Sequence, residues 1–171
     1  MKIVRLDSDN AAVLMADSAW RPDRRPYFVP EGEAPVCEIR PALRIDRLGK
    51  AINPKFASRY IGAWTPVCYM RPSGSQSGLA PAGMLDDSLV VGTWMPLPHG
   101  EVPLALGDIT ASWGLDLGAA SQLIATLSAS STFKTGDIVV LPRTIFSFTP
   151  VAGSSVRLTA AGNPVLEFNI R

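Results

Sequence analysis

Short apolar stretches, separated by proline and glycine, run through most of this chain. With 15 prolines and 14 glycines among 171 residues, the pattern favours many short strands over long helices. Residues 20–30 hold three prolines and are expected to form extended edge structure, because proline cannot donate to a sheet ladder. Alternating or β-branched segments predict strands at residues 2–5, 12–15, 36–45, 60–70, 88–96, 137–141, 155–159 and 165–170.

Two segments are expected to be helical, one from its periodicity and one from the residues at its start. Ala120, Leu123, Ile124 and Leu127 repeat at helical spacing and predict a helix over residues 117–130. A shorter helix is expected to begin at Pro54, with Asn53 as its N-cap, and to end near Tyr60. The fold class is therefore mostly β with one main α-helix.

Two proline-containing segments qualify this picture. Pro41 lies inside the predicted strand 36–45 and indicates that this strand is an edge or carries a bulge. Pro72–Gly83 is rich in serine, glycine and proline, so a mobile loop that buries little is expected there. Because no linker or internal repeat divides the chain, residues 1–171 are predicted to form a single domain.

Composition excludes several classes of function. The formal net charge is +1 without a basic patch, which argues against nucleic acid as a partner, and no apolar run approaches the roughly 20 residues that span a bilayer. The amino-terminal residues lack the apolar core of a secretory signal, so a cytoplasmic location is expected, with Cys37 and Cys68 as reduced, buried thiols. The single histidine, His99, excludes any site built on two histidines.

The polar residues alone do not assemble an active site. Glu38 and Arg40 are two apart on a predicted strand and therefore share one face, where they form an ion pair or a small anion-binding spot in which Arg40 holds a carboxylate. An exposed pair of this kind contributes roughly 0–1 kcal/mol. Asp86 and Asp87 are neighbours that point to opposite faces of a strand, so a solvated turn is favoured over a metal site. Neither cysteine has a histidine nearby to activate it.

Several segments, in order and at matching spacing, resemble the fumarylacetoacetate hydrolase family, and in particular its short, single-domain, acylpyruvase-like members. This resemblance implies mixed β-sheets packed as the family's β-sandwich or roll. It also implies that the family's amino-terminal lid segment has no counterpart before Val13. The matching segments are Pro26–Pro30, Glu38–Lys50, Phe56–Tyr60, Asp86–Trp94, Phe133–Asp137 and Leu166–Arg171.

The same resemblance implies that the metal site is degenerate. The family holds Mg²⁺ or Mn²⁺ with a Glu-x-Glu pair and an aspartate on a later strand. Glu38 matches the first glutamate, but Arg40 takes the place of the second, and the aspartate falls at Tyr69. A guanidinium about 4–5 Å from a divalent ion would cost roughly 7 kcal/mol at an effective dielectric of 20, so no metal cofactor is predicted.

The substrate-binding positions are altered as well. The family's substrate lysine falls at Gly83, three residues before Asp86, and its substrate loop contains Arg143. Together with Glu38, Arg40 and Tyr69, these residues make up what the resemblance implies is a vestigial pocket without catalytic residues.

Two functions remain open. The first is a catalytically inactive relative that acts by binding a small carboxylate or by assembly, as a homodimer or in a heteromer with an active relative. In that case Tyr69, Trp64 and Trp94 would help to fill the emptied pocket. The second is a hydrolase or decarboxylase of small oxo-acids, in which Arg40, Arg143 and Tyr69 grip the substrate without a metal.

Overall fold

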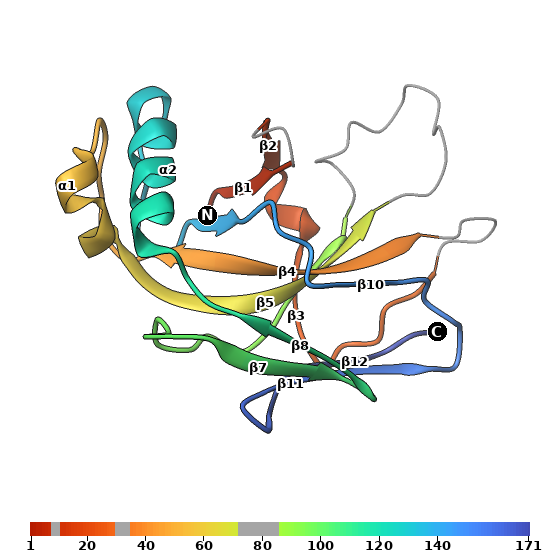
Figure 1. The fold of residues 1–171 in the computed structure, drawn as a ribbon. Coiled ribbons are helices and arrows are strands. Elements are labelled where there is room, and N and C mark those ends of the chain that lie inside the picture. The colour runs from red at the N-terminus through yellow and green to blue at the C-terminus, as the bar shows by residue number, and fades with distance from the viewer. Residues whose placement is uncertain (8–10, 30–34, 72–85) are drawn as a thin grey trace.

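The computed structural model describes residues 1–7, 11–29, 35–71 and 86–171. The predicted loop Pro72–Gly83 lies outside these residues. Within them, most of the chain forms two β-sheets, with two α-helices at one end (Figure 1). The strands of the larger sheet are β1 (Ile3–Leu6), β2 (Ala12–Met15), β3 (Trp20–Pro22), β4 (Val36–Ile45), β5 (Ile61–Arg71), β6 (Leu89–Val91), β9 (Ile138–Val140) and β10 (Phe146–Phe148). The strands of the smaller sheet are β7 (Val102–Leu106), β8 (Ile109–Trp113), β11 (Ser155–Ala160) and β12 (Asn163–Asn169).

The larger sheet is mixed. Its strands follow the order β2-β1-β9-β4-β5-β6-β3, with β10 also paired to β4. The pairs β1/β9 and β3/β6 are parallel, whereas β4 runs antiparallel to β5, β9 and β10. As expected from its prolines, the segment that begins at Trp20 forms an edge strand. The predicted mostly β fold with mixed sheets is confirmed.

The smaller sheet contains a hairpin that the strand predictions missed. Strands β7 and β8 pair from Leu106 and Ile109 outward, joined by the two-residue turn Gly107-Asp108. Gly107 has a φ of +59°, which glycine adopts without steric cost. A Gly-Asp pair between two apolar segments is a known hairpin signal. Pro103 and the polar residues of β8 obscured the flanking alternation.

Of the two outcomes that Pro41 predicted for its strand, an edge position is wrong, whereas a bulge is present, between Arg44 and Ile45 rather than at Pro41. Strand β4 is internal, with β5 along one side; on its other side, β10 pairs with residues 37–39 and β9 with residues 42–44. Pro41 falls in the gap between these two partners, where a missing N–H breaks no ladder hydrogen bond. Its carbonyl accepts from Leu141 N (2.8 Å), at the start of the connection from β9 to β10.

The main hydrophobic core lies between the two sheets and against the second helix. Trp64 from β5 packs on Trp113 from β8, with ring centroids 4.4 Å apart. Other members come from both sheets and the helix, among them Ile39, Leu43, Cys68, Leu104, Ile124, Leu158, Leu166 and Phe168. Because the interior face of β4 carries Cys37, Ile39 and Leu43, its alternate residues must point to the opposite face of the sheet.

Both helices begin at the residues that the sequence predicts, and each is capped by a side chain, of which only Asn53 was predicted as a cap. Helix α1 (Pro54–Ala57) follows Asn53, whose side chain accepts from Lys55 N at 3.0 Å, and a 3-10 turn continues it to residue 60. Helix α2 (Leu117–Ser130) follows Asp116, whose carboxylate accepts from Ala119 N at 2.9 Å. Among the described residues, no helix is long and apolar enough to cross a membrane.

Candidate functional site

Charged side chains gather on the face of the larger sheet that points away from the smaller sheet. We call this the arginine face and define it by Arg5, Asp7, Glu38, Arg40, Tyr69 and Arg71. Register explains how residues far apart in sequence meet there: Arg5 lies beside Val140, which lies beside Ala42, two residues from Arg40. Around these charges lies a small apolar cluster that includes Ile3, Ala42, Val67, Tyr69, Leu89 and Val140.

Glu38 is held in an ion pair. Its side chain is 15% exposed, and its Oε1 accepts from Arg71 Nε at 2.8 Å. Tyr69 lies directly opposite Glu38 in the β4/β5 register, and Ser147 from β10 lies opposite on the other side. Sequence spacing correctly put Glu38 and Arg40 on one face, but the ion-pair partner of Glu38 is Arg71 from the neighbouring strand.

Arg40 is a buried cation, with only 4% of its surface exposed. The β1/β9 pairing ends at Arg5, and Arg40 Nη2 donates to the carbonyl of the next residue, Leu6, at 2.6 Å. Its Nη1 lies 4.0 Å from Asp7 Oδ1. Burial lowers the pKa of Arg40, Glu38 and Asp7 oppose that change, and the positive charge of Arg5 adds to it.

Arg5 is the second buried cation of this face. Its guanidinium lies 4.4 Å from the centroid of the Tyr69 ring, and its Nη2 is 3.1 Å from Asp7 Oδ2. Burial raises the pKa of the Tyr69 hydroxyl, although Arg5 acts in the opposite direction. Arg5 and Asp7 are not among the site residues that the sequence predicts. The available signal is alternation along Ile3–Asp7, which puts both charges on the same side as a buried isoleucine.

Each of these arginines has one buried donor for which the described residues supply no acceptor. Arg5 Nε and Arg40 Nε are buried and donate to no acceptor in the part of the chain that the structure describes. Buried polar groups without a hydrogen bond are rare in folded proteins, since each one costs roughly 1–3 kcal/mol. Two such donors lie near the Asp7 carboxylate, which both arginines share. This arrangement makes the arginine face suited to binding an anion.

The other candidate residues are dispersed. Asp86 is exposed in a turn, as predicted, and Asp87 beside it lies 3.9 Å from Arg21. Gly83 lies outside the described residues. Arg143 is exposed and lines a cavity of about 310 Å³ at the start of α2. The cavity's other lining residues include Trp113, Asp116, Leu123 and Leu141 but neither Arg40 nor Tyr69.

The aromatic residues expected to fill the pocket divide between the two faces. Tyr69 is 2% exposed on the arginine face, and Trp94 packs against the apolar cluster there, 5.4 Å from the Arg44 guanidinium. Trp64 lies on the other side of the sheet, in the main core. The expectation for Trp64 is therefore wrong, because even-numbered residues of β5 face the smaller sheet.

The cysteines are buried, free thiols in the main core. Cys37 Sγ lies 3.1 Å from Met70 Sδ, and Cys68 is fully buried. Burial raises the pKa of the Cys68 thiol well above its ordinary value. A thiol that resists ionisation is a poor nucleophile, so Cys68 serves packing.

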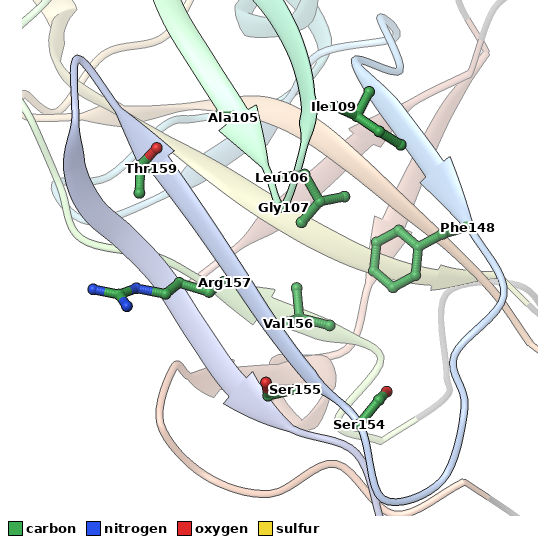
Figure 2. Close-up of a pocket in the computed structure, with 10 residues that line it drawn as sticks. All are labelled: Ala105, Leu106, Gly107, Ile109, Phe148, Ser154, Ser155, Val156, Arg157 and Thr159. Carbon is green, nitrogen blue, oxygen red and sulfur yellow. The ribbon is translucent and has the colours of Figure 1, made fainter.

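A larger cavity, of about 570 Å³, opens on the smaller sheet between the β7–β8 hairpin, β10 and β11 (Figure 2). Its lining is mainly apolar, with Leu106, Ile109, Phe148 and Val156. Arg157 is its one charged residue, and Figure 2 shows this side chain pointing away from Phe148 and Ile109. The cavity therefore lacks the paired acid and base that catalysis needs. Elsewhere too, the described residues contain no group of three or more His, Cys, Asp or Glu side chains placed to hold a metal ion.

Several solved structures align with almost the whole of this chain. A 2-hydroxyhepta-2,4-diene-1,7-dioate isomerase from Mycobacterium marinum aligns with a TM-score of 0.80 at 20% identity, over 99% of this chain and 73% of its own. A maleylpyruvate hydrolase from Sphingobium sp. SYK-6, solved with manganese(II) and pyruvate, aligns with a TM-score of 0.76 at 17% identity, over 99% of this chain and 69% of its own.

The description of a third structure includes the name of a family. This structure is described as a fumarylacetoacetate hydrolase family protein from Yersinia pestis CO92, and it aligns with a TM-score of 0.74 at 16% identity, over 99% of this chain and 92% of its own. No protein-family model and no curated protein matches the chain. At these identities the likeness establishes the fold: this chain has the fold of the fumarylacetoacetate hydrolase family, as the resemblance implied.

Proposed function

We propose that this protein is a catalytically inactive member of the fold that acts by binding. The observation that carries the proposal is the position of Arg40, which is buried on the arginine face where the resemblance places a metal-binding glutamate. Glu38, which matches the other glutamate, is already neutralised by Arg71. A hard divalent cation requires several oxygen ligands and repels a nearby guanidinium, so these residues do not fit Mg²⁺ or Mn²⁺.

Metal binding and turnover test this proposal directly. We expect Mg²⁺ and Mn²⁺ to leave the melting temperature unchanged, and acylpyruvates and oxaloacetate to show no turnover with or without either metal. A bound metal whose free concentration is 100 times its dissociation constant would raise the free energy of unfolding by about 2.7 kcal/mol. For a domain of this size, that is an increase of several degrees in melting temperature. A shift of that size that is abolished in Glu38→Ala but persists in Glu167→Ala, which alters an exposed carboxylate on β12, would overturn the proposal.

The alternative, a metal-independent enzyme for small oxo-acids, needs Arg143 to join Arg40 and Tyr69 around one substrate. The cavity that Arg143 lines contains neither of them, so no specific contact favours this function. Turnover above background that is lost in Arg40→Ala would nevertheless establish it over the proposal made here.

We also propose that binding extends to assembly, as a homodimer or with an active relative. Strand β2 lies at the end of the larger sheet in the described residues and exposes Leu14, which is 64% accessible. Unpaired edge strands with exposed apolar side chains are common sites of chain association. Size-exclusion chromatography with light scattering should show a species larger than the monomer. A strict monomer that captures no relative would contradict this part of the proposal.

The two cysteines support a reducing compartment, and we propose the cytoplasm. Cys37 and Cys68 are both free and buried in the main core. Thiol labelling of the denatured protein, taken from its native cells, should count two free thiols. Oxidised cysteines in that sample would contradict this location.

A further inference from the structure

The arginine face already holds one carboxylate between two guanidiniums, and that carboxylate belongs to the chain itself. Asp7 Oδ2 lies 3.1 Å from Arg5 Nη2, and Asp7 Oδ1 lies 4.0 Å from Arg40 Nη1. The two arginine side chains are 5% and 4% exposed, whereas the Asp7 side chain is 39% exposed. Asp7 is therefore the member of this group that solvent and a dissolved ligand reach most readily.

The cluster has more positive charge and more donors than Asp7 can satisfy. Arg5 and Arg40 contribute two positive charges and Asp7 one negative charge, while Glu38 is neutralised by Arg71. Both buried Nε donors have no acceptor within the described residues. The contact between Arg40 and Asp7 is also long for a charge-assisted hydrogen bond, which is ordinarily about 2.7–2.9 Å.

We propose that Arg5 and Arg40 form a binding site for a small organic carboxylate, in which Asp7 is a built-in competitor that the ligand displaces. This inference rests on the proposed function, since a metal-free face is what leaves the two guanidiniums available. It adds to that function a second cation, Arg5, which the sequence did not single out, and an internal competitor, Asp7, which the ligand must displace. A planar carboxylate matches the fork of guanidinium donors, and a cation–π contact with the Tyr69 ring, whose centroid lies 4.4 Å away, helps to hold the Arg5 guanidinium in place.

Displacement of Asp7 gives the proposal a specific test. Malonate serves as the probe and is titrated in the presence of EDTA, which removes divalent metals. Its binding is compared with that of inorganic phosphate and of chloride at equal ionic strength. We expect calorimetry to detect malonate binding, and the NMR signals of the Arg5 and Arg40 Nε–H groups to shift with it. Asp7→Asn should tighten malonate binding about three- to ten-fold, because the internal competitor loses its charge.

A matched control separates displacement from general electrostatics. Asp46 is also paired with an arginine two residues earlier, Arg44, at 2.9 Å, and its side chain is 38% exposed. Asp46→Asn therefore removes the same charge from the same kind of pair outside the cluster. Malonate affinity should be unchanged in this variant. Equal tightening in Asp46→Asn and Asp7→Asn would overturn the proposal in favour of diffuse charge attraction.

Substitution of Arg40 by lysine tests whether binding needs the planar donor fork of a guanidinium or only its positive charge. Arg40→Lys keeps the positive charge but loses the planar fork, and we expect at least ten-fold weaker malonate binding. Because a buried arginine variant can fail to fold, its unfolding transition is measured first, and Asp7→Asn, at a half-exposed position, keeps the test decisive by itself. No malonate binding to either the wild type or Asp7→Asn would overturn the proposal.

The remaining outcomes also discriminate. Phosphate that binds more tightly than malonate would overturn the assignment of a carboxylate ligand. Malonate binding that appears only when Mn²⁺ replaces EDTA would overturn the proposed function as well, since the site would then be built on a metal. Absence of malonate binding under both conditions would overturn the carboxylate site alone and leave the proposed absence of catalysis standing.

Discussion

Ile39 and Arg40 are neighbours on β4 and almost equally buried, but they face opposite sides of the larger sheet. Ile39 is fully buried in the core between the sheets, and Arg40 is 4% exposed on the arginine face. On the interior side the core is built mainly from apolar side chains. On the arginine face burial is achieved with guanidiniums, the tyrosine ring beside Arg5 and a shared carboxylate, and two donors have no acceptor among the described residues.

This difference separates a face built for stability from a face built for interaction. Apolar burial contributes roughly 25 cal/mol for each Å² removed from water and needs no exact partner. A buried charge contributes to stability only when its partners compensate for lost hydration, and replacing such a pair by apolar residues is often neutral. The arginine face is therefore costly to maintain for stability alone, which is consistent with a binding role.

The largest effect is expected from the interior face. Trp64→Ala removes a ring that is 1% exposed and stacked on Trp113, so the free energy of unfolding should fall by about 3–5 kcal/mol. Trp94→Ala, on the arginine face, removes a partly buried ring and should cost less than half as much. Chemical denaturation of both variants checks this, and equal losses would show that the two faces do not differ in this way.

A second, smaller effect compares the neighbours on β4. Ile39→Ala should lower the free energy of unfolding by about 2–4 kcal/mol through the cavity it leaves. Arg40→Met should change the same free energy by about 1 kcal/mol or less, because loss of the bond to the Leu6 carbonyl is offset by removal of a buried charge with an unsatisfied donor. A loss above about 3 kcal/mol in Arg40→Met would show that this arginine is a structural residue.

The same contrast explains how much could be predicted from the sequence. Alternation predicted β4 at its exact bounds, Val36–Ile45, and helical periodicity predicted α2 at Leu117–Ser130. These patterns show which side of an element is buried, and the spacing of the buried residues indicates whether the element is a helix or a strand. The β7–β8 hairpin was missed because its signal lay in the turn residues while its strands carried proline and polar side chains.

The candidate site could be predicted only in part. Glu38, Arg40 and Tyr69 were placed together by the resemblance, and the sheet register brings them to one face. Alternation could have put Arg5 and Asp7 on one side of their strand, but not beside Arg40, because the order of strands across the sheet determines which charges meet. In the sheet, β9 lies between β1 and β4 and pairs with both. Strand β9 comes more than 130 residues after β1 in the chain.

A third prediction concerns the shared carboxylate of the arginine face. Asp7→Asn should lower the free energy of unfolding by about 1 kcal/mol at low ionic strength, because Arg5 and Arg40 lose a counter-charge that is itself partly solvated. The loss should shrink in about 1 M NaCl, where the Debye length is about 3 Å. Denaturant titrations at two salt concentrations measure it. A loss that is independent of salt would indicate a packing effect.

The smallest effect is a dependence on alkaline pH. Burial raises the pKa of Tyr69 in the folded protein above the ordinary value of about 10, so the unfolded chain releases this proton first as the pH rises. The contribution of Tyr69 to stability is therefore complete below about pH 10 and declines as the pH rises toward the folded-state pKa. Tyr69→Phe should show a shallower loss of stability above pH 10 than the wild type. Tyr60→Phe, which removes a hydroxyl from a half-buried ring outside the arginine face, is the control, and the same slope in Tyr69→Phe as in the wild type would show that Tyr69 keeps an ordinary pKa in the folded protein.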